Sequence, residues 1–357
     1  MPVSRAAWLR PLWLLGAFLA AFNSVAAPPD LDGIEDGIWI DRERIKALPM
    51  EGPAWEKLLK DADRPIDHPD LTNQDERTKV YVVAKALVYV RTGKDEYRDQ
   101  VIEVVHAVMG TETRPGGRTL ALGRNLMGYV LAADLVGLPD DLDEEFRAWL
   151  QQVVNYRFAS GRTLISTHEG RPNNWGTAAG ASRIAVSAYL GDEKDLERAA
   201  QVYLGWCGDR SSYDGFKYKK VEWWQADPTR PVGINPSGSE IAGHSVDGVL
   251  PEEMRRAGPF HWPPKKENYA YTGLQGALPQ AVMLDRLGYD AFGCGDQALR
   301  RAFEWLYKEA DYPAEDDDEW MIYVINDAYD IDLPVTFPAS RGKVIGYADW
   351  THPTAGD

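Results

Sequence analysis

Apolar residues recur along most of the chain at intervals of three and four positions, the spacing of an amphipathic helix. The pattern predicts helical cores at residues 80–87, 101–108, 122–133, 146–154, 181–188, 196–203, 274–281 and 299–306. Helical segments in this number, with few strand-like stretches between them, predict an all-α fold.

Turn signals separate these segments and indicate helix pairs with short connections. Four glycines follow helical stretches: Gly93, Gly137, Gly191 and Gly288. Three aspartates suit the N-caps of the helices that come next: Asp95, Asp141 and Asp192. The alternation favours an (α/α) toroid, or barrel, of helical hairpins. No repeat of fixed period is visible, which disfavours a regular solenoid. No linker is evident either, so residues 28–357 are predicted to form one domain.

One long stretch, residues 206–271, breaks the helical pattern and is rich in Gly, Pro, Trp, Tyr, Lys and His. Irregular segments of this length are uncommon in compact domains unless they serve a function. Residues 214–234 are compatible with a short hairpin. The acidic run at residues 315–319 is expected to be a solvated turn.

The first 27 residues have the parts of a secretory signal. Arg5 and Arg10 precede an apolar run at residues 12–22, which is too short to span a bilayer. Small residues around Ala26 supply the cleavage pattern. The mature protein is therefore expected to be secreted or periplasmic, with no membrane association after cleavage.

Composition limits the partners. The net charge of −16 argues against nucleic acid, because that affinity comes from neutralising phosphates. Net charge does not set the charge of a single cleft, so an acidic ligand remains compatible with it. Neither a CxxC nor an HExxH pattern occurs, and no metal or cofactor is expected. Cys207 and Cys294 fit either one disulfide or two buried thiols.

Candidate chemistry gathers in three clusters. Residues 171–177 (RPNNWGT) place Asn173 and Asn174 just before a predicted helix, beside an arginine and a tryptophan. One of the two amides is a suitable N-cap, but capping does not explain both. The second cluster runs from residue 235 to His244. The third runs from residue 252 to 271 and holds Arg255, Arg256, two lysines, a histidine and two tyrosines.

Five segments carry a resemblance to a known family: residues 38–55, 84–93, 173–176, 250–253 and 268–271. In these the chain resembles the alginate-lyase-type polysaccharide lyases. It is most similar to the smaller, secreted α/α-toroid lyases that act on β-1,4-glucuronan (cellouronate) or polymannuronate. The resemblance implies an (α/α) barrel with a long groove or tunnel. One position departs from it: related alginate lyases have a histidine directly after the asparagine pair, where this chain has Trp175. His244, or His261 behind it, is the candidate to replace that histidine.

Elimination from a uronate requires a neutralised C6 carboxylate, removal of the C5 proton and protonation of the departing O4. Asn173 or Asn174, with Arg255 or Arg256, are candidates to stabilise the developing charge. In gluco- and manno-configured uronates the C5 hydrogen and O4 lie on one ring face, so a single phenol can serve both. Tyr269 is the first candidate and Tyr271 the second. A guluronate has these groups on opposite faces, and His244 as base with Tyr269 as acid is then expected.

The expected partner is an acidic polysaccharide, bound by a monomer. Aromatic rings pack on sugars, and cations pair with carboxylates. The residues expected to contact the sugar chain are Arg171, Trp175, Lys219, Trp223, Trp224, His261, Trp262, Lys265 and Tyr271.

Two other functions stay open at this point. A glycoside hydrolase needs two carboxylates that flank the cleaved bond, and the irregular stretch offers Glu222, Asp227, Glu240 and Asp247. A non-catalytic polyuronate-binding protein would need no grouping of His, Arg and Tyr.

Overall fold

The computed structural model describes residues 37–353, and its regular structure is almost entirely helical. The predicted signal sequence lies outside the described residues. The elements in chain order are α1 (Arg42–Ala47), α2 (Pro53–Ala62), α3 (Thr78–Thr92), α4 (Asp95–Val108), η2 (Thr111–Thr113), α5 (Thr119–Val136), α6 (Asp140–Val153), α7 (Leu164–Gly170), α8 (Asn174–Leu190), α9 (Glu193–Cys207), α10 (Val221–Trp224), β1 (Glu240–Ile241), β2 (His244–Ser245), α11 (Pro251–Met254), η3 (Arg255–Ala257), α12 (Tyr269–Arg286), α13 (Cys294–Lys308), η4 (Asp316–Asp318), α14 (Trp320–Tyr329) and α15 (Ala348–Thr351).

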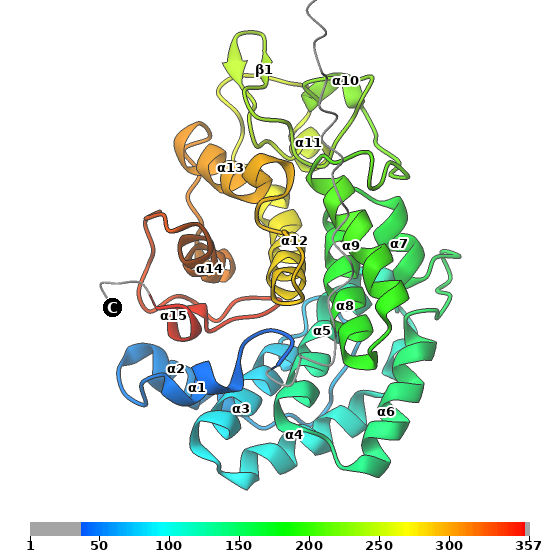
Figure 1. Cartoon of the computed structure of the whole chain (residues 1–357), viewed down its shortest axis with the longest axis vertical. Helices are drawn as coiled ribbons and strands as arrows, with labels where there is room; N and C mark the ends of the chain where they lie inside the picture. Colours follow the sequence, from blue (N-terminus) through cyan, green and yellow to red (C-terminus); the bar gives the residue numbers. More distant parts are fainter. Residues whose placement is uncertain (1–36, 354–357) are drawn as a thin grey trace, which may run out of the picture.

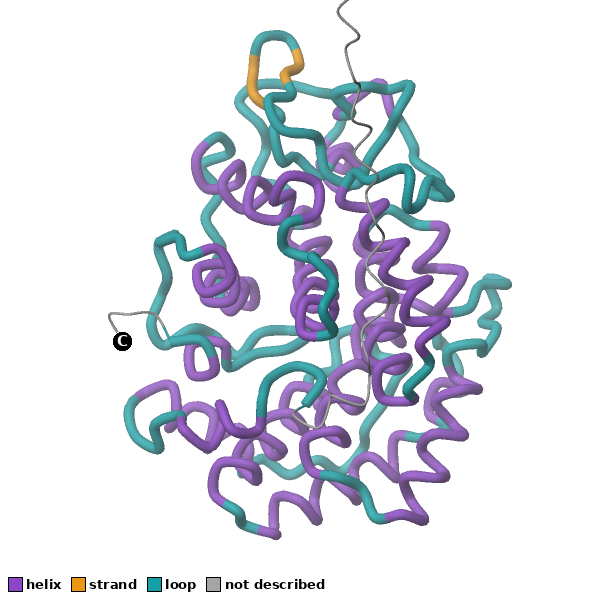
Figure 2. The backbone as a smooth tube through the Cα atoms, in the orientation of Figure 1, coloured by secondary structure: helices purple, strands orange, loops and turns teal. Residues whose placement is uncertain are grey.

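The helices form hairpins arranged around a common centre (Figures 1 and 2). Helix α3 packs on α5, α5 on α8, and α8 on α12, while α4 and α9 cover the outside of α3 and α8. Helices α5 and α8 are buried on nearly all sides, which explains why both are apolar around their whole circumference. The predicted all-α toroid is confirmed.

The predicted helical cores fall within α3, α4, α5, α6, α8, α9, α12 and α13. The four glycines predicted at helix ends follow α3, α5, α8 and α12, and all have positive φ. Of the three aspartates, Asp192 caps α9 by accepting a hydrogen bond from the Asp195 backbone N–H at 3.0 Å. Asp95 and Asp141 are instead in the first turns of α4 and α6.

The irregular stretch forms a lobe at one end of the toroid, which contains α10, the β1–β2 hairpin and α11 (Figure 1). The hairpin pairs Glu240 with Ser245, so the interpretation of residues 214–234 as a hairpin was wrong. The acidic run is also more than a solvated turn. It forms η4, and Asp318 within it is buried.

Cys207 and Cys294 are both free and buried in the structure. A hydrogen bond with Cys207 and burial both raise the pKa of the Cys294 thiol. Among residues 37–353, no helix has the length and apolar character needed to cross a membrane.

Candidate active site

Three inner helices bring their N-termini to the same end of the toroid. The side chain of Ser182 in α8 donates to the Gly123 carbonyl at 2.8 Å, and one turn further along α5 it accepts from the Met127 N–H at 3.0 Å. Helix α12 runs beside α8 in the same direction, with Gly276 against Thr177 and Gln280 against Gly180. A side chain at Gly276 would overlap the α8 backbone, so this close approach requires glycine. The starts of α5, α8 and α12 therefore face one region, which is electropositive from the helix dipoles.

The asparagine pair forms the tight turn into α8. The Gly176 N–H donates to the Asn173 carbonyl at 2.7 Å, and a side chain at position 176 would overlap the Arg171 carbonyl oxygen. Asn173 is the N-cap residue, but its side chain makes no capping hydrogen bond. The side-chain oxygens of Asn173 and Asn174 are both buried and unpartnered within residues 37–353. Helix capping therefore does not account for either amide.

Glu253 joins this turn to α11. Its carboxylate accepts a hydrogen bond from the Asn174 backbone N–H, and it packs against Gly273, one turn after Tyr269 in α12. Glu253 is buried, and burial raises its pKa to about 8, although Asn174, Arg256 and Arg255 oppose the shift. At neutral pH the side chain is mainly a neutral acid.

Tyr269 lies among positive charges at the start of α12. The Arg256 guanidinium carbon is 4.2 Å from the centre of its ring. Arg124, from the second turn of α5, interacts electrostatically with both Tyr269 and Glu253. Tyr269 is 40% exposed, which is unusual for a large aromatic residue here and leaves its ring open to solvent.

Arg171 and Trp175 extend the same site from the α8 side. The Arg171 guanidinium stacks on the Trp175 ring at 4.4 Å. Burial lowers the pKa of Arg171, and repulsion from Arg162 and Arg256 lowers it further. Arg171 is therefore near enough to Arg256, which stacks on Tyr269, for their charges to interact.

Several predicted residues lie elsewhere. Arg255 is paired with Glu252 at 2.7 Å, which leaves Arg256 as the arginine next to Tyr269. Tyr271 is fully buried and donates to the Tyr312 carbonyl at 2.6 Å, so its predicted sugar contact was wrong. It points away because residues two apart on a helix face different directions. Trp224 is also fully buried, with its indole N–H bonded to the Gly258 carbonyl at 2.9 Å, and cannot stack on a sugar.

The predicted histidines belong to the irregular lobe. His244, on β2, stacks on Trp262 with 4.5 Å between ring centres, and His261 bonds the Pro259 carbonyl at 2.9 Å. None of the six histidines, all within residues 37–353, makes a hydrogen bond or ring contact with Asn174, Arg256 or Tyr269. The structure thus places no histidine in contact with these three residues.

The remaining candidates line the surface of the same lobe. Lys219 is exposed, and its backbone N–H bonds Glu252 at 2.5 Å. Trp223 is half-buried under Lys220. Lys265 is exposed and reaches the Ala257 carbonyl at 3.3 Å. The lobe therefore has aromatic and basic residues at its surface, while Trp224 is buried in its interior.

The carboxylates considered for a hydrolase do not converge on this site. Glu222, Asp227 and Glu240 are exposed at separate points of the lobe. Asp247 is paired with Arg301 at 2.6 Å. Among residues 37–353, none of these four makes a hydrogen bond or ion pair with Asn174, Arg256 or Tyr269.

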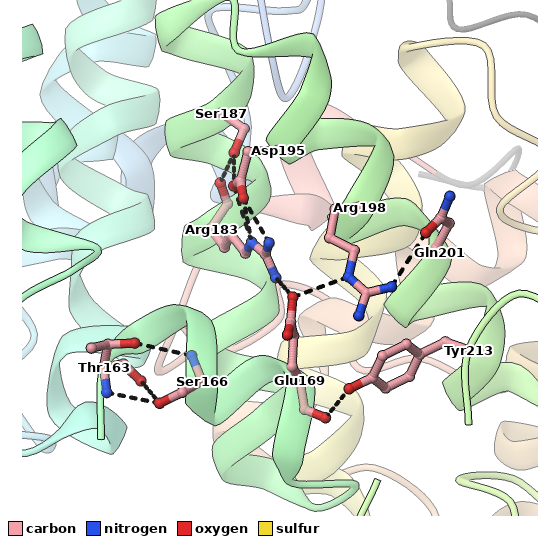
Figure 3. A network of polar contacts seen from close by, with 9 residues as sticks. All are labelled: Thr163, Ser166, Glu169, Arg183, Ser187, Asp195, Arg198, Gln201 and Tyr213. Atoms are coloured by element: carbon pink, nitrogen blue, oxygen red, sulfur yellow. Dashed lines mark hydrogen bonds and ion pairs between the residues drawn. The ribbon is translucent and has the colours of Figure 1, made fainter. Parts of the chain in front are cut away.

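A polar network behind the site fixes α7, α8 and α9 to one another (Figure 3). Arg183 of α8, only 2% exposed, pairs with Asp195 of α9 at 2.6 Å and with Glu169 of α7 at 3.2 Å. Arg198 reaches the same Glu169 carboxylate at 3.2 Å from the more exposed side. The Tyr213 hydroxyl donates to the Glu169 backbone carbonyl at 2.5 Å. The network therefore anchors the start of the irregular stretch beside the α8 turn.

Residues 60–217 match the family model described as alginate lyase, a segment that includes Asn174 and ends within the irregular stretch. The matched segment is less than half of the chain, and it supports the alginate-lyase-type polysaccharide lyase superfamily. No curated protein matches this chain.

Solved structures share the fold of this chain at low sequence identity. An alginate lyase from Bacteroides ovatus is 14% identical with a TM-score of 0.51, covering 81% of this chain and 89% of its own. A histidine-to-alanine variant of alginate lyase A1-III, complexed with a tetrasaccharide, is 13% identical with a TM-score of 0.56, covering 88% and 90%. A tyrosine-to-phenylalanine variant of the same enzyme, also with a tetrasaccharide, is 12% identical with a TM-score of 0.54, covering 92% and 93%.

Two residues that sequence reasoning missed are central to the site. Glu253 lies in the segment 250–253, which carried part of the family resemblance, but no role was predicted for it. Arg124 was not predicted as a site residue. The available signal for Arg124 was the pair Arg124-Asn125 inside an otherwise apolar helix. Only the packing shows that both Glu253 and Arg124 are buried beside Tyr269.

Proposed function

We propose that the lyase cleaves a β-1,4-linked polyuronate, glucuronan (cellouronate) or the polymannuronate of alginate, by β-elimination. The observation that carries the proposal is the meeting of buried asparagine amides, a stacked arginine and an open tyrosine at the N-termini of α8 and α12. The tetrasaccharide complexes of the two A1-III structures support an oligosaccharide ligand for this fold.

The first step is charge neutralisation at C6. The amides of Asn173 and Asn174 and the guanidinium of Arg256 are donors for the uronate carboxylate, and they stabilise the enolate-like charge that develops on it. Donors that are already in place need no reorganisation during the reaction, which is why such sites contribute strongly to catalysis. The positive ends of α5, α8 and α12 add to the same effect.

The second step is proton transfer by Tyr269. Arg256 and Arg124 place positive charge beside the Tyr269 ring. The phenolate takes the C5 proton, the electron pair forms the C4–C5 double bond, and the C4–O4 bond breaks. The same phenol then returns the proton to the departing O4. This sequence requires the C5 hydrogen and O4 on one ring face, which favours glucuronan and polymannuronate over polyguluronate.

A panel of glucuronan, polymannuronate, polyguluronate and pectate tests the proposal. Ultraviolet absorbance reports the unsaturated bond of an elimination product, and a reducing-end assay counts every cleavage. We expect both signals to rise together on glucuronan or polymannuronate. New reducing ends without ultraviolet absorbance would indicate hydrolysis and overturn the proposal, as would binding of all four polymers without cleavage.

Export is part of the same proposal, because a polymeric substrate does not enter a cell. The signal-like residues 1–27 support it. Mass spectrometry of the protein from the culture medium or periplasm should give a mature N-terminus close to Ala27. Recovery of the uncut chain from the cytoplasm alone would contradict export.

A further inference from the structure

A cavity of about 260 Å³ lies next to the candidate active site and shares only Arg124 with the residues assigned above. One wall is a single face of α12, formed by Asn268, Thr272 and Gln275 at helical spacing. Asn268 directly precedes Tyr269. The opposite wall comes from residues 312–318 and Lys343, and Arg124 closes the cavity from α5.

Arg124 is the feature of this cavity that calls for a ligand. It is 7% exposed, and within residues 37–353 its guanidinium makes no hydrogen bond. Its closest carboxylate is Asp75, at 4.0 Å, and Asp75 is itself held by Lys343 at 2.8 Å. Arginine remains charged in proteins, and burying a charge without a close partner is costly. An anionic group bound in the cavity would offset that cost.

Gln275 provides a second unpartnered group on the same cavity. Its amide nitrogen donates to Asp318 at 2.5 Å, while its side-chain oxygen is buried with no partner in the described part of the chain. That oxygen is free to accept from a hydroxyl group. The cavity thus presents a buried cation and a buried acceptor, which match the carboxylate and hydroxyls of one sugar acid.

Four acidic residues form part of the opposite wall, and they differ in their surroundings. Glu315 and Asp316 are exposed, so solvent screens their charge. Burial raises the pKa of Asp318 to about 7, so it carries only part of a negative charge at neutral pH. Asp317 is held by two contacts from Arg77, at 2.7 and 2.8 Å. Lys343, which pairs with Asp75, and Arg124 are the two cations that line the cavity.

We propose that this cavity is a subsite for one uronate ring adjacent to the cleaved linkage, with Arg124 pairing its carboxylate and Gln275 accepting from a ring hydroxyl. The proposal rests on the polyuronate substrate argued above and adds a specificity-determining arginine to it. The subsite lets the enzyme require a carboxylate on the ring next to the one that reacts.

Binding measured without turnover tests the subsite. In a Tyr269→Phe background, calorimetry compares a tetrasaccharide of the preferred uronate with its carboxyl-reduced, neutral counterpart. Arg124→Met should weaken binding of the uronate by about 10-fold or more, the loss of one charge-assisted contact, and leave the neutral sugar unchanged. Arg124→Lys should recover part of the loss. Lys194→Met is the matched control, because it removes one exposed charge from the first turn of α9.

Thermal unfolding of the unliganded protein separates a binding role from a structural one. Arg124→Met should unfold at the same temperature as the parent or higher, because it removes a buried and poorly paired charge. An uronate affinity within about twofold of the parent, or equal losses for the charged and neutral sugars, would overturn the subsite. Cleavage by the wild type is measured in parallel. If the wild type forms unsaturated product and Arg124→Met has an unchanged affinity for the uronate, the subsite alone is refuted. Absence of unsaturated product from every polyuronate refutes the proposed function.

Discussion

At the scale of single residues, Glu253 connects the α8 turn to α11 and α12 and does so as a neutral acid. Its pKa of about 8 in the folded protein lies above the ordinary value of 4.5. Between these values the unfolded chain has lost a proton that the folded chain keeps. The contribution of Glu253 to the free energy of unfolding therefore falls as pH rises through this window.

Glu253→Gln should remove that slope while keeping an acceptor for the Asn174 N–H. Relative to the wild type, the free energy of unfolding of the variant should increase by up to about 1.4 kcal/mol per pH unit from about pH 5 to pH 8. Urea unfolding at several pH values measures the difference. Parallel curves for the two proteins would show that Glu253 is ionised in the native state across the whole range.

Asn174→Ala distinguishes catalysis from helix capping. Because the side-chain oxygen of Asn174 has no partner among the described residues, its removal should leave the unfolding temperature nearly unchanged. The loss of a donor to the developing charge should lower kcat by about 100-fold or more. A variant with full turnover and a lower unfolding temperature would return Asn174 to a purely structural role.

Sequence reasoning at this scale selected residues by their chemistry and missed those whose position depends on packing. Asn174, Arg256 and Tyr269 were chosen for their chemistry, and the fold brings them together. Arg124 was missed because an arginine in a helix is ordinarily solvated, and its burial follows from neighbours distant in sequence. Trp224 was misassigned for the converse reason, since nothing local distinguishes a core tryptophan from one that binds sugar.

At the scale of elements, the network of Figure 3 holds α7 and α9 on α8. Arg183→Met would leave Asp195 and Glu169 without their buried cation, and we expect a loss of about 3 kcal/mol in the free energy of unfolding. Arg198→Met removes a cation from the same Glu169 carboxylate, but its side chain is 43% exposed. That control should cost less than about 1 kcal/mol. Equal losses, measured by urea unfolding, would contradict the role assigned to burial.

The elements were predictable to the extent that they are amphipathic or long. Helices such as α4 and α9 show one apolar face, and glycine marks their ends. The short β1–β2 hairpin was not found, because two residues per strand give no alternation to detect. Helix α14 was also missed, since its residues are buried on most sides and carry no helical period.

At the scale of the whole molecule, the parallel inner helices place the site. The starts of α5, α8 and α12 point to one end of the toroid, and the irregular lobe covers that end. The sequence predicted the toroid and the long irregular stretch, but not which helix ends would meet. That depends on the glycine contacts between α8 and α12, which have no signature in the hydrophobic pattern.

This arrangement predicts a stereochemical preference. With one phenol and no histidine in contact with it, elimination should proceed only where the C5 hydrogen and O4 share a ring face. We expect polyguluronate to be cleaved at least about 100-fold more slowly than glucuronan or polymannuronate, the contribution of one acid–base catalyst. Initial rates of ultraviolet absorbance on matched polymers measure the ratio. Comparable rates would require a second proton-transfer group.

The central claim is that Tyr269 carries the proton from C5 to O4. The most direct test is the rate of unsaturated-product formation by Tyr269→Phe on the preferred polymer, with tetrasaccharide affinity measured alongside. The account predicts a fall in kcat of about 100-fold to 10,000-fold with affinity nearly unchanged. A variant that still forms unsaturated ends at close to the wild-type rate would contradict it.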